Sequence, residues 1–146
     1  MSTVIGRQAA KSTQGNDAAI GGHSAARILV VEDDYFIAME IEATLVAAGY
    51  EVVGIAATAA EAAEMAGAHH PDMAVMDIRL REGPDGIDAA IELFRVMGIR
   101  SLFATAHEDA ETRRRAAVAK PLGWLAKPFS PPSLREAVRA AIAHLR

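Results

Sequence analysis

The chain has 146 residues, a length that predicts one domain. It carries a formal net charge of -4, which argues against a protein that binds nucleic acid through phosphate contacts. It contains no cysteine, and this excludes disulfide frameworks, thiolate metal sites and thiol nucleophiles.

Residues 1–26 are rich in Ser, Thr, Gly, Gln and Ala and show no sustained hydrophobic period. This composition predicts a disordered N-terminal tail, followed by a folded domain over residues 27–146. The tail lacks the apolar core of a secretory signal, and no apolar run in the chain approaches membrane-spanning length. We therefore expect a cytoplasmic protein without a membrane partner.

The first apolar run, residues 28–31, is typical of a strand that is buried on both faces, as in a parallel sheet. Three carboxylates, Glu32, Asp33 and Asp34, follow it directly. Their mutual repulsion costs stability unless a cation neutralises it. Asp33 or Asp34 is also a suitable N-cap for the next helix, but a cap uses only one of the three carboxylates.

Helix and strand patterns alternate after these carboxylates. A helix and then a strand are predicted within residues 35–55. Thr58 and Glu61 then form a capping box, and the helix that they begin ends near the pair His69 and His70. Neighbouring side chains at a helix end diverge, so these histidines are expected to be solvated rather than to bind a metal.

A third apolar run, residues 73–76, ends at Asp77. In parallel α/β sheets the ligand site lies just outside the carboxyl ends of the strands, although an aspartate at a strand end also commonly begins a turn. Glycine and proline turn signals follow over residues 79–85, and an apolar stripe predicts a helix over residues 87–97.

The last two strand–helix units complete the chain. A strand over residues 102–104 ends at Thr105, and the next helix, predicted over residues 108–119, carries three consecutive arginines. A short strand then ends at Lys127, and Ser130 caps a final helix with proline at its first position. The residues expected on the buried face of that helix are Leu134, Val138, Ile142 and Leu145.

Five strand–helix units predict a doubly wound α/β fold, with a five-stranded parallel sheet and helices on both faces. All strands of such a sheet end at one edge, so the polar residues that follow four of them should gather there. These residues are Glu32 and Asp33, Asp77, Thr105 and Lys127. Clustered carboxylates suit Mg²⁺, an aspartate can form an acyl phosphate, and a hydroxyl and a fixed cation suit phosphoryl oxygens. The constellation therefore indicates phosphoryl transfer.

The residues that carry these features closely resemble a known family. They are Ile28-Leu29-Val30-Val31-Glu32-Asp33-Asp34, Met76-Asp77, Thr105-Ala106 and Lys127-Pro128-Phe129. The family is the receiver domain of two-component response regulators, and the resemblance covers about residues 27–146. It implies a flavodoxin-like fold with strand order 2-1-3-4-5 and five helices, and a regulator of the single-domain type.

The resemblance also implies the chemistry of the site. Asp77 would accept a phosphoryl group from the phosphohistidine of a histidine kinase. Asp33 and Asp77 would ligate Mg²⁺ directly, and Glu32 would act mainly through water. The backbone carbonyl of Arg79 would be a further ligand.

Two residues of the family pattern would respond to the phosphoryl group. Thr105 would contact it and move on activation, whereas Lys127 would pair with it and precede a typically cis bond to Pro128. Trp124 matches the aromatic switch position of the family, which is usually Tyr, Phe or His. The alternative for Trp124 is half-exposed packing against the final helix.

Residues near Asp77 and Thr105 add finer expectations. Arg79 and His107 flank the path of the attacking water in the family, so we expect them to tune the phosphate lifetime. Residues 103–105 also resemble a Phe-Ala-Thr-Gly subgroup common in alphaproteobacterial signalling. The match is partial, because Ala106, His107 and Glu108 replace the end of that motif.

The implied partners are a sensor histidine kinase or phosphotransfer protein and a downstream protein target, without nucleic acid. The chain would be a monomer or a weak homodimer that catalyses only its own phosphorylation and dephosphorylation. Its output face would include parts of residues 108–119 and 133–145 together with Trp124. Arg113 and Arg114 on that face are either partner contacts or merely solvated.

Two other functions fit parts of the sequence. A Mg²⁺-dependent aspartyl-phosphate phosphatase typically needs an Asp-x-Asp pair after its first strand, and Glu32-Asp33-Asp34 lacks that spacing. A receiver-like module that binds partners without phosphorylation would not need the complete acidic, Thr105 and Lys127 set.

Overall fold

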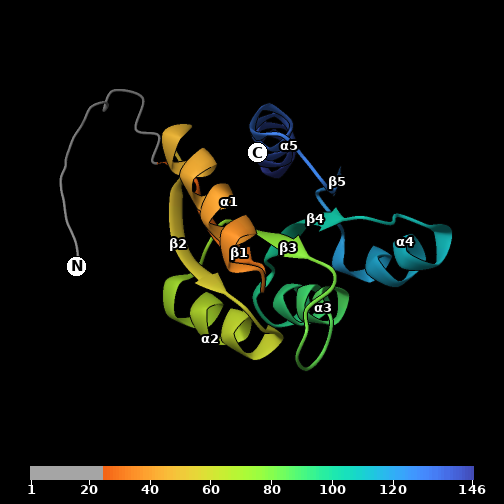
Figure 1. The fold of residues 1–146 in the computed structure, drawn as a ribbon. Helices are drawn as coiled ribbons and strands as arrows, with labels where there is room; N and C mark the ends of the chain where they lie inside the picture. Colours follow the sequence, from red (N-terminus) through yellow and green to blue (C-terminus); the bar gives the residue numbers. More distant parts are fainter. Residues whose placement is uncertain (1–24) are drawn as a thin grey trace.

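The computed structural model describes residues 25–146, so almost all of the predicted disordered tail lies outside the described residues. The described part forms one parallel sheet of five strands in the order β2-β1-β3-β4-β5 (Figure 1), which confirms the predicted order. The strands are β1 (Arg27–Val31), β2 (Glu51–Ala56), β3 (Met73–Asp77), β4 (Arg100–Thr105) and β5 (Gly123–Ala126).

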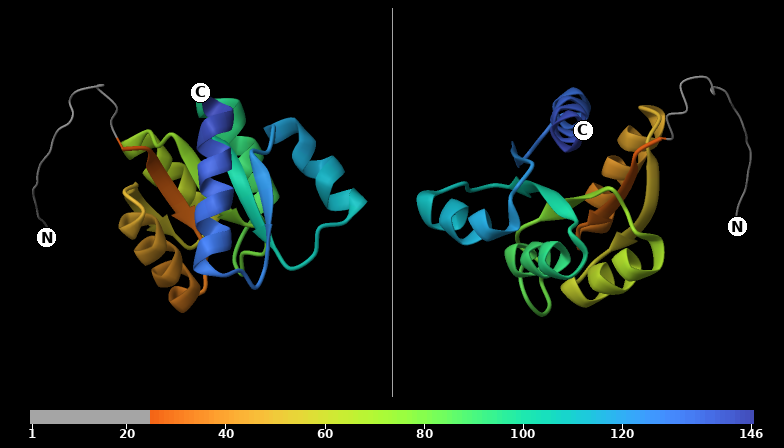
Figure 2. Two further views of the ribbon diagram at one scale, coloured as in Figure 1. Left: turned by 90° about the horizontal axis from the view of Figure 1, so that it is seen from above. Right: turned by 180° about the vertical axis from the view of Figure 1, so that it is seen from behind.

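Helices cover both faces of this sheet (Figure 2), as expected for a doubly wound fold. One face is covered by α1 and α5, which contact each other, and the other by α2 and α3, with α4 beside α3. The helices are α1 (Tyr35–Ala47), α2 (Ala59–His69), α3 (Gly86–Met97), α4 (Ala110–Ala116) and α5 (Pro131–Leu145). Because successive strand residues point to opposite faces, each side of the sheet has its own hydrophobic core.

Strand register determines which residues meet at the carboxyl edge of the sheet. Val31 of β1 is aligned with Met76 of β3, so the carboxylates that follow these two residues become neighbours. Further along the edge, the backbone N–H of Lys127 donates to the carbonyl of Thr105 at 2.9 Å. The predicted polar residues are therefore brought together by backbone pairing before any side-chain contact is considered.

Two helix caps follow the sequence prediction. The Asp34 carboxylate accepts the N–H groups of Phe36 and Ile37 at 2.9 and 3.1 Å, so Asp34 caps α1. Thr58 Oγ1 accepts the N–H of Glu61 at 3.1 Å and caps α2. Since Asp34 serves as a cap, Glu32 and Asp33 are the carboxylates of the triplet that remain for another role.

The structure corrects three details of the sequence prediction. Ala26 was assigned to the tail, but it is buried and its carbonyl accepts the N–H of Glu51 at 2.9 Å. Leu145 was expected in the core but is 37% exposed, since the last buried residue of α5 is Ile142. The helix predicted over residues 108–119 is shorter, because Asp109 caps α4 and its last residues form a separate 3₁₀ turn. Within residues 25–146, no helix is both long enough and apolar enough to cross a membrane.

Candidate phosphoryl-acceptor site

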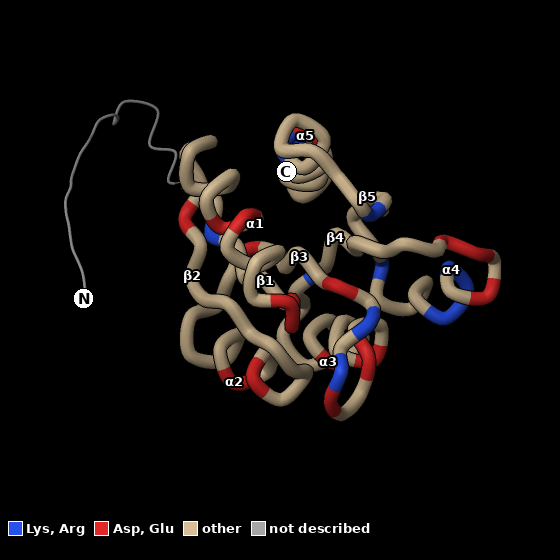
Figure 3. Tube along the Cα trace, in the orientation of Figure 1, with Lys and Arg blue, Asp and Glu red and all other residues tan. Residues whose placement is uncertain are grey.

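A cleft of about 310 Å³ opens at the carboxyl edge of the sheet, beyond the ends of β1, β3, β4 and β5. Figure 3 shows acidic and basic positions gathered where β1 and β3 end. The residues that line the cleft are Glu32, Asp33, Asp34, Ile37, Asp77, Arg79, Arg81, Thr105, Ala106 and Lys127. All the residues predicted as metal ligands or as phosphoryl contacts are among them, whereas His107 and Trp124 are not.

Lys127 binds two buried carboxylates at the centre of the cleft. Its Nζ lies 3.2 Å from Glu32 Oε1 and 3.3 Å from Asp77 Oδ1, and these two acidic residues are only 3% and 5% exposed. Burial alone would lower the pKa of the Lys127 ammonium, but the negative charges of Asp77 and Glu32 outweigh it and raise the pKa. Lys127 is therefore a fixed cation beside Asp77, and its peptide bond to Pro128 is cis, as expected.

The pKa of Glu32 is raised even though the Lys127 ammonium lies beside its carboxylate. Burial, and to a lesser extent the neighbouring charge of Asp77, raise the pKa of the Glu32 carboxyl to about 7. The Asp34 N–H, which donates to Glu32 Oε2 at 3.0 Å, and the Lys127 ammonium only partly oppose this rise. A further positive charge in the cleft would thus favour the ionised form of Glu32.

Three carboxylates are close enough to share such a charge. Oxygen atoms of Glu32, Asp33 and Asp77 all lie within 4.8 Å of one another. Oxygen ligands of this kind suit Mg²⁺, so the residues present fit the metal that the sequence predicts. The Arg79 N–H lies 3.4 Å from Asp77 Oδ1, which brings the backbone of the predicted fourth ligand to the same carboxylate.

Arg81 is a cleft residue that the sequence prediction missed. Its backbone N–H donates to Asp33 Oδ2 at 2.9 Å, and its Nε lies 3.4 Å from the same oxygen. The two residues are far apart in the sequence, and Arg81 lies in a loop rich in charges and turn signals. No periodic pattern marks such a residue, so only the fold reveals the contact.

Thr105 is buried, and its hydroxyl is bound by the backbone that follows β4. Thr105 Oγ1 donates to the carbonyl of His107 at 2.9 Å and accepts the N–H of His107 at 3.1 Å. The His107 side chain itself is exposed. His107 therefore contacts the cleft residue Thr105 through its backbone.

A profile of the response regulator receiver domain matches residues 28–139. This chain belongs to that family. It is 38% identical over 122 residues to the transcriptional regulatory protein PdtaR of Mycobacterium tuberculosis, and the match covers 82% of this chain and 58% of PdtaR. It is 33% identical over 120 residues to the phyllosphere-induced regulator PhyR of Methylorubrum extorquens, with 81% of this chain and 44% of PhyR covered. The chain thus spans about half the length of these two curated relatives.

Smaller relatives and solved structures agree with this assignment. The chemotaxis protein CheY of Bacillus subtilis is 34% identical over 117 residues, which cover 80% of this chain and 97% of CheY. The receiver domain of a modulated diguanylate cyclase from Desulfovibrio desulfuricans has a TM-score of 0.76 and 32% identity, and 84% of this chain and 97% of that chain are covered. The response regulator PhyR from Brucella abortus has a TM-score of 0.70 and 33% identity, with 83% and 49% covered.

Trp124 of this receiver domain lies in β5, on the side of the sheet that faces α4. Its ring stacks on Phe103 with a centroid distance of 5.0 Å and an interplanar angle of 25°. The guanidinium of Arg113 lies over the Trp124 ring, 5.3 Å from its centroid, and also pairs with Glu108. The predicted alternative of packing against the final helix is therefore wrong about the neighbour.

The other two arginines of α4 also have partners in the chain. Arg114 pairs with Glu111 on the same helix. Arg115 donates to Asp85 and Asp88 at the start of α3, at 3.1 Å in each case. The alternative of mere solvation therefore does not hold for Arg115, which connects α4 to the helix that follows the cleft loop, whereas Arg114 and Glu111 are both about 70% exposed.

Proposed function

We propose that this receiver domain accepts a phosphoryl group on Asp77 within a two-component phosphorelay in the cytoplasm. The donor is the phosphohistidine of a sensor histidine kinase or a phosphotransfer protein. A carboxylate oxygen of Asp77 attacks the phosphorus, an oxygen–phosphorus bond forms as the nitrogen–phosphorus bond breaks, and the imidazole leaves with the donor. The observation that carries the proposal is the Lys127 ammonium 3.3 Å from Asp77, in a cleft that also contains the carboxylates of Glu32 and Asp33.

The cation of this site would be Mg²⁺. Asp33 and Asp77 would hold it directly, Glu32 mainly through water, and Arg79 through its backbone carbonyl. The support for this set is its chemistry, since three carboxylates whose oxygens lie within 4.8 Å suit a hard cation. When bound, the ion neutralises charge that the phosphoryl oxygens bring into an already acidic cleft.

Lys127 and Thr105 would bind the phosphoryl oxygens from the opposite side. Lys127 already has its ammonium at the Asp77 carboxylate, so it needs only a small shift to donate to a new oxygen. The Thr105 hydroxyl must first leave the His107 carbonyl. Because that hydroxyl holds the backbone after β4, its movement would release the segment that carries Glu108, the partner of Arg113.

Arg79 and His107 would tune the lifetime of the acyl phosphate. The Arg79 side chain is exposed and lines the cleft, so it can obstruct or orient an attacking water. His107 contacts Thr105 through backbone atoms that an alanine substitution would keep. We therefore expect Arg79→Ala to change dephosphorylation several-fold and His107→Ala to change it less.

Output would pass to a downstream protein through the face formed by α4, β5 and α5. The support is the stack of Phe103, Trp124 and Arg113, which joins β4, β5 and α4 next to the backbone that Thr105 holds. Aromatic and arginine side chains are also enriched at interface hot spots. Because Arg113 and Arg114 pair with acidic residues of their own chain, a partner would compete with Glu108 and Glu111 for them.

Phosphorylation by acetyl phosphate and Mg²⁺, followed by intact-protein mass spectrometry, tests the proposal. We expect one added phosphoryl group in the wild type and none in Asp77→Asn, because an amide is not a nucleophile toward phosphorus. Asp88→Asn is the matched control, since Asp88 is an exposed aspartate outside the cleft. Normal labelling of Asp77→Asn would refute the assignment, and rapid turnover without a stable adduct would favour a phosphatase.

A further inference from the structure

The three carboxylates proposed to hold the cation, Glu32, Asp33 and Asp77, each have a cationic neighbour within the chain. Lys127 lies 3.2 Å from Glu32 and 3.3 Å from Asp77, and Arg81 lies 3.4 Å from Asp33. The two cations differ in burial, because the Lys127 side chain is 19% exposed and that of Arg81 is 76% exposed. Lys127 is thus part of the cleft interior, whereas Arg81 approaches Asp33 from the solvent.

Arg81 contacts Asp33 in two separable ways. Its backbone N–H and its Nε both reach Asp33 Oδ2, at 2.9 and 3.4 Å. The N–H fixes the loop of residues 79–85 against Asp33, and this bond does not depend on the side chain. Within residues 25–146, the ion pair with Asp33 is the only one that the Arg81 guanidinium makes. A substitution at position 81 therefore removes the positive charge while it keeps the backbone bond.

We propose that the Arg81 guanidinium is a resident counter-cation of Asp33, which competes with the divalent cation for this carboxylate and so sets how much Mg²⁺ the receiver requires. The inference rests on the proposed function, because the cation site is the one proposed there. The side chain of Asp33 is only 12% exposed, so its negative charge is poorly solvated and is stabilised by a neighbouring cation. A divalent ion at Asp33 would repel a guanidinium at the same oxygen. The guanidinium therefore has to move away when the ion binds.

The size of the effect follows from the exposure of the pair. Because the Arg81 side chain is 76% exposed, water screens its attraction to Asp33 and the ion pair is stabilised only weakly, so competition from Arg81 weakens Mg²⁺ binding about two- to fivefold. The competition is between charges and does not depend on the radius of the ion. Removal of the guanidinium should therefore raise the affinities for Mg²⁺ and Ca²⁺ by the same factor. Added monovalent salt should reduce that factor, because salt screens exposed charges.

Isothermal titration calorimetry of the metal-free chain with MgCl₂ and with CaCl₂ tests this competition without phosphorylation. We expect Arg81→Ala and Arg81→Gln to bind both ions about two- to fivefold more tightly than the wild type. Arg135→Ala is the matched control, because it removes an exposed arginine of α5 that lies outside the cleft. Circular dichroism melting curves establish that all variants are folded.

The outcomes distinguish the inference from the function on which it rests. Unchanged or weaker binding in both Arg81 variants would overturn the competition, and so would an equal gain in Arg135→Ala. A gain for only one of the two ions would mean that Arg81 shapes the site by geometry, which also contradicts charge competition. If Asp33→Ala binds Mg²⁺ as the wild type does, the proposed cation site is wrong, and the function fails before the inference is reached.

Discussion

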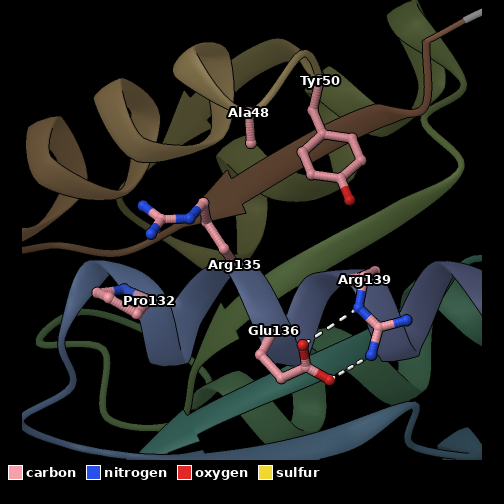
Figure 4. Close-up of a pocket in the computed structure, with 6 residues that line it drawn as sticks. All are labelled: Ala48, Tyr50, Pro132, Arg135, Glu136 and Arg139. Carbon is pink, nitrogen blue, oxygen red and sulfur yellow. Dashed lines mark hydrogen bonds and ion pairs between the residues drawn. The ribbon is translucent and has the colours of Figure 1, made fainter.

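The phosphoryl-acceptor cleft and the groove between α1 and α5 have similar sizes, and both are lined by acidic and basic residues, but these charged residues differ in burial and in their neighbours. The groove has a volume of about 370 Å³, against about 310 Å³ for the cleft. Figure 4 shows the residues that line the groove, with Glu136 and Arg139 paired along one helix. These residues are Ala48, Tyr50, Pro132, Arg135, Glu136 and Arg139.

Glu136 of the groove and Glu32 of the cleft have pKa values that move in opposite directions. The hydrogen bond from Arg139 lowers the pKa of Glu136, and both side chains are about two-thirds exposed. Burial raises the pKa of Glu32, whose neighbours Asp77 and Lys127 come from distant parts of the chain. An exposed pair three residues apart on a helix is a common surface feature. Buried charges gathered from several strands cost stability, so they mark the functional site more reliably than the size of a hollow does.

The largest effect that separates the two hollows is expected in the pH dependence of stability. In the metal-free wild type, the pKa of Glu32 is raised from 4.5 to about 7 by burial and by Asp77. The folded state therefore keeps a proton that the unfolded chain has lost, and the unfolding free energy falls as pH rises from about 4.5 to about 7. We expect Glu32→Gln to remove a loss on the order of 2 kcal/mol, measured by urea unfolding at several pH values.

Glu136→Gln provides the control with the opposite sign. The pKa of Glu136 is lowered by Arg139, so its contribution to stability is present at neutral pH and is lost only as the solution becomes more acidic. The slope between pH 4.5 and 7 should therefore persist in Glu136→Gln. If Glu32→Gln retains the wild-type slope, burial of Glu32 does not govern the charge balance of the cleft.

An intermediate effect is expected at Trp124, which lies outside both hollows. We predict that a beryllofluoride mimic with Mg²⁺ changes the Trp124 emission, because Thr105 would release the segment that carries Glu108 and so disturb Arg113 on the indole. The change should be absent in Asp77→Asn and normal in Arg135→Ala, a groove variant. Since the chain contains one Trp, steady-state fluorescence reports on this position alone.

A silent Trp124 would contradict this route from the cleft to α4. Arg113→Gln separates the two parts of the route, because it removes the guanidinium from the ring and leaves the stack on Phe103. We expect the emission change to become smaller in this variant while phosphorylation of Asp77 remains normal. An unchanged response in Arg113→Gln would show that the signal reaches Trp124 through Phe103 instead.

The sequence was sufficient for the fold and for the residues that follow the strands. Apolar runs gave the strands, and because parallel strands end at one edge, Asp77 and Lys127 were expected to meet although they lie in different strand–helix units. Side-chain contacts made by loop residues were not predictable in this way. Arg81 reaches Asp33 because of the path of the loop, and Arg115 reaches Asp85 because of where α4 lies against α3.

The same limit applies to Trp124. Its place in the family pattern was evident from the sequence. Its neighbours, however, depend on the face of the sheet on which the Trp124 side chain lies. It points to the side of Phe103 and α4, where Arg113 covers the ring. Helical spacing predicts pairs such as Glu136 and Arg139, but it carries no information about the contact between Trp124 of β5 and Arg113 of α4.

The smallest effect is expected from that helical pair itself. Glu136 and Arg139 are both exposed, so the attraction between them is screened by water and is offset by the ordering of two long side chains. We predict that Glu136→Gln, Arg139→Gln and the double variant melt at the wild-type temperature at pH 7, within the reproducibility of calorimetry. They should also bind Mg²⁺ and accept a phosphoryl group normally, because neither residue lines the cleft. A loss of phosphorylation in Arg139→Gln would break the comparison, since it would make the groove between α1 and α5 part of the functional surface.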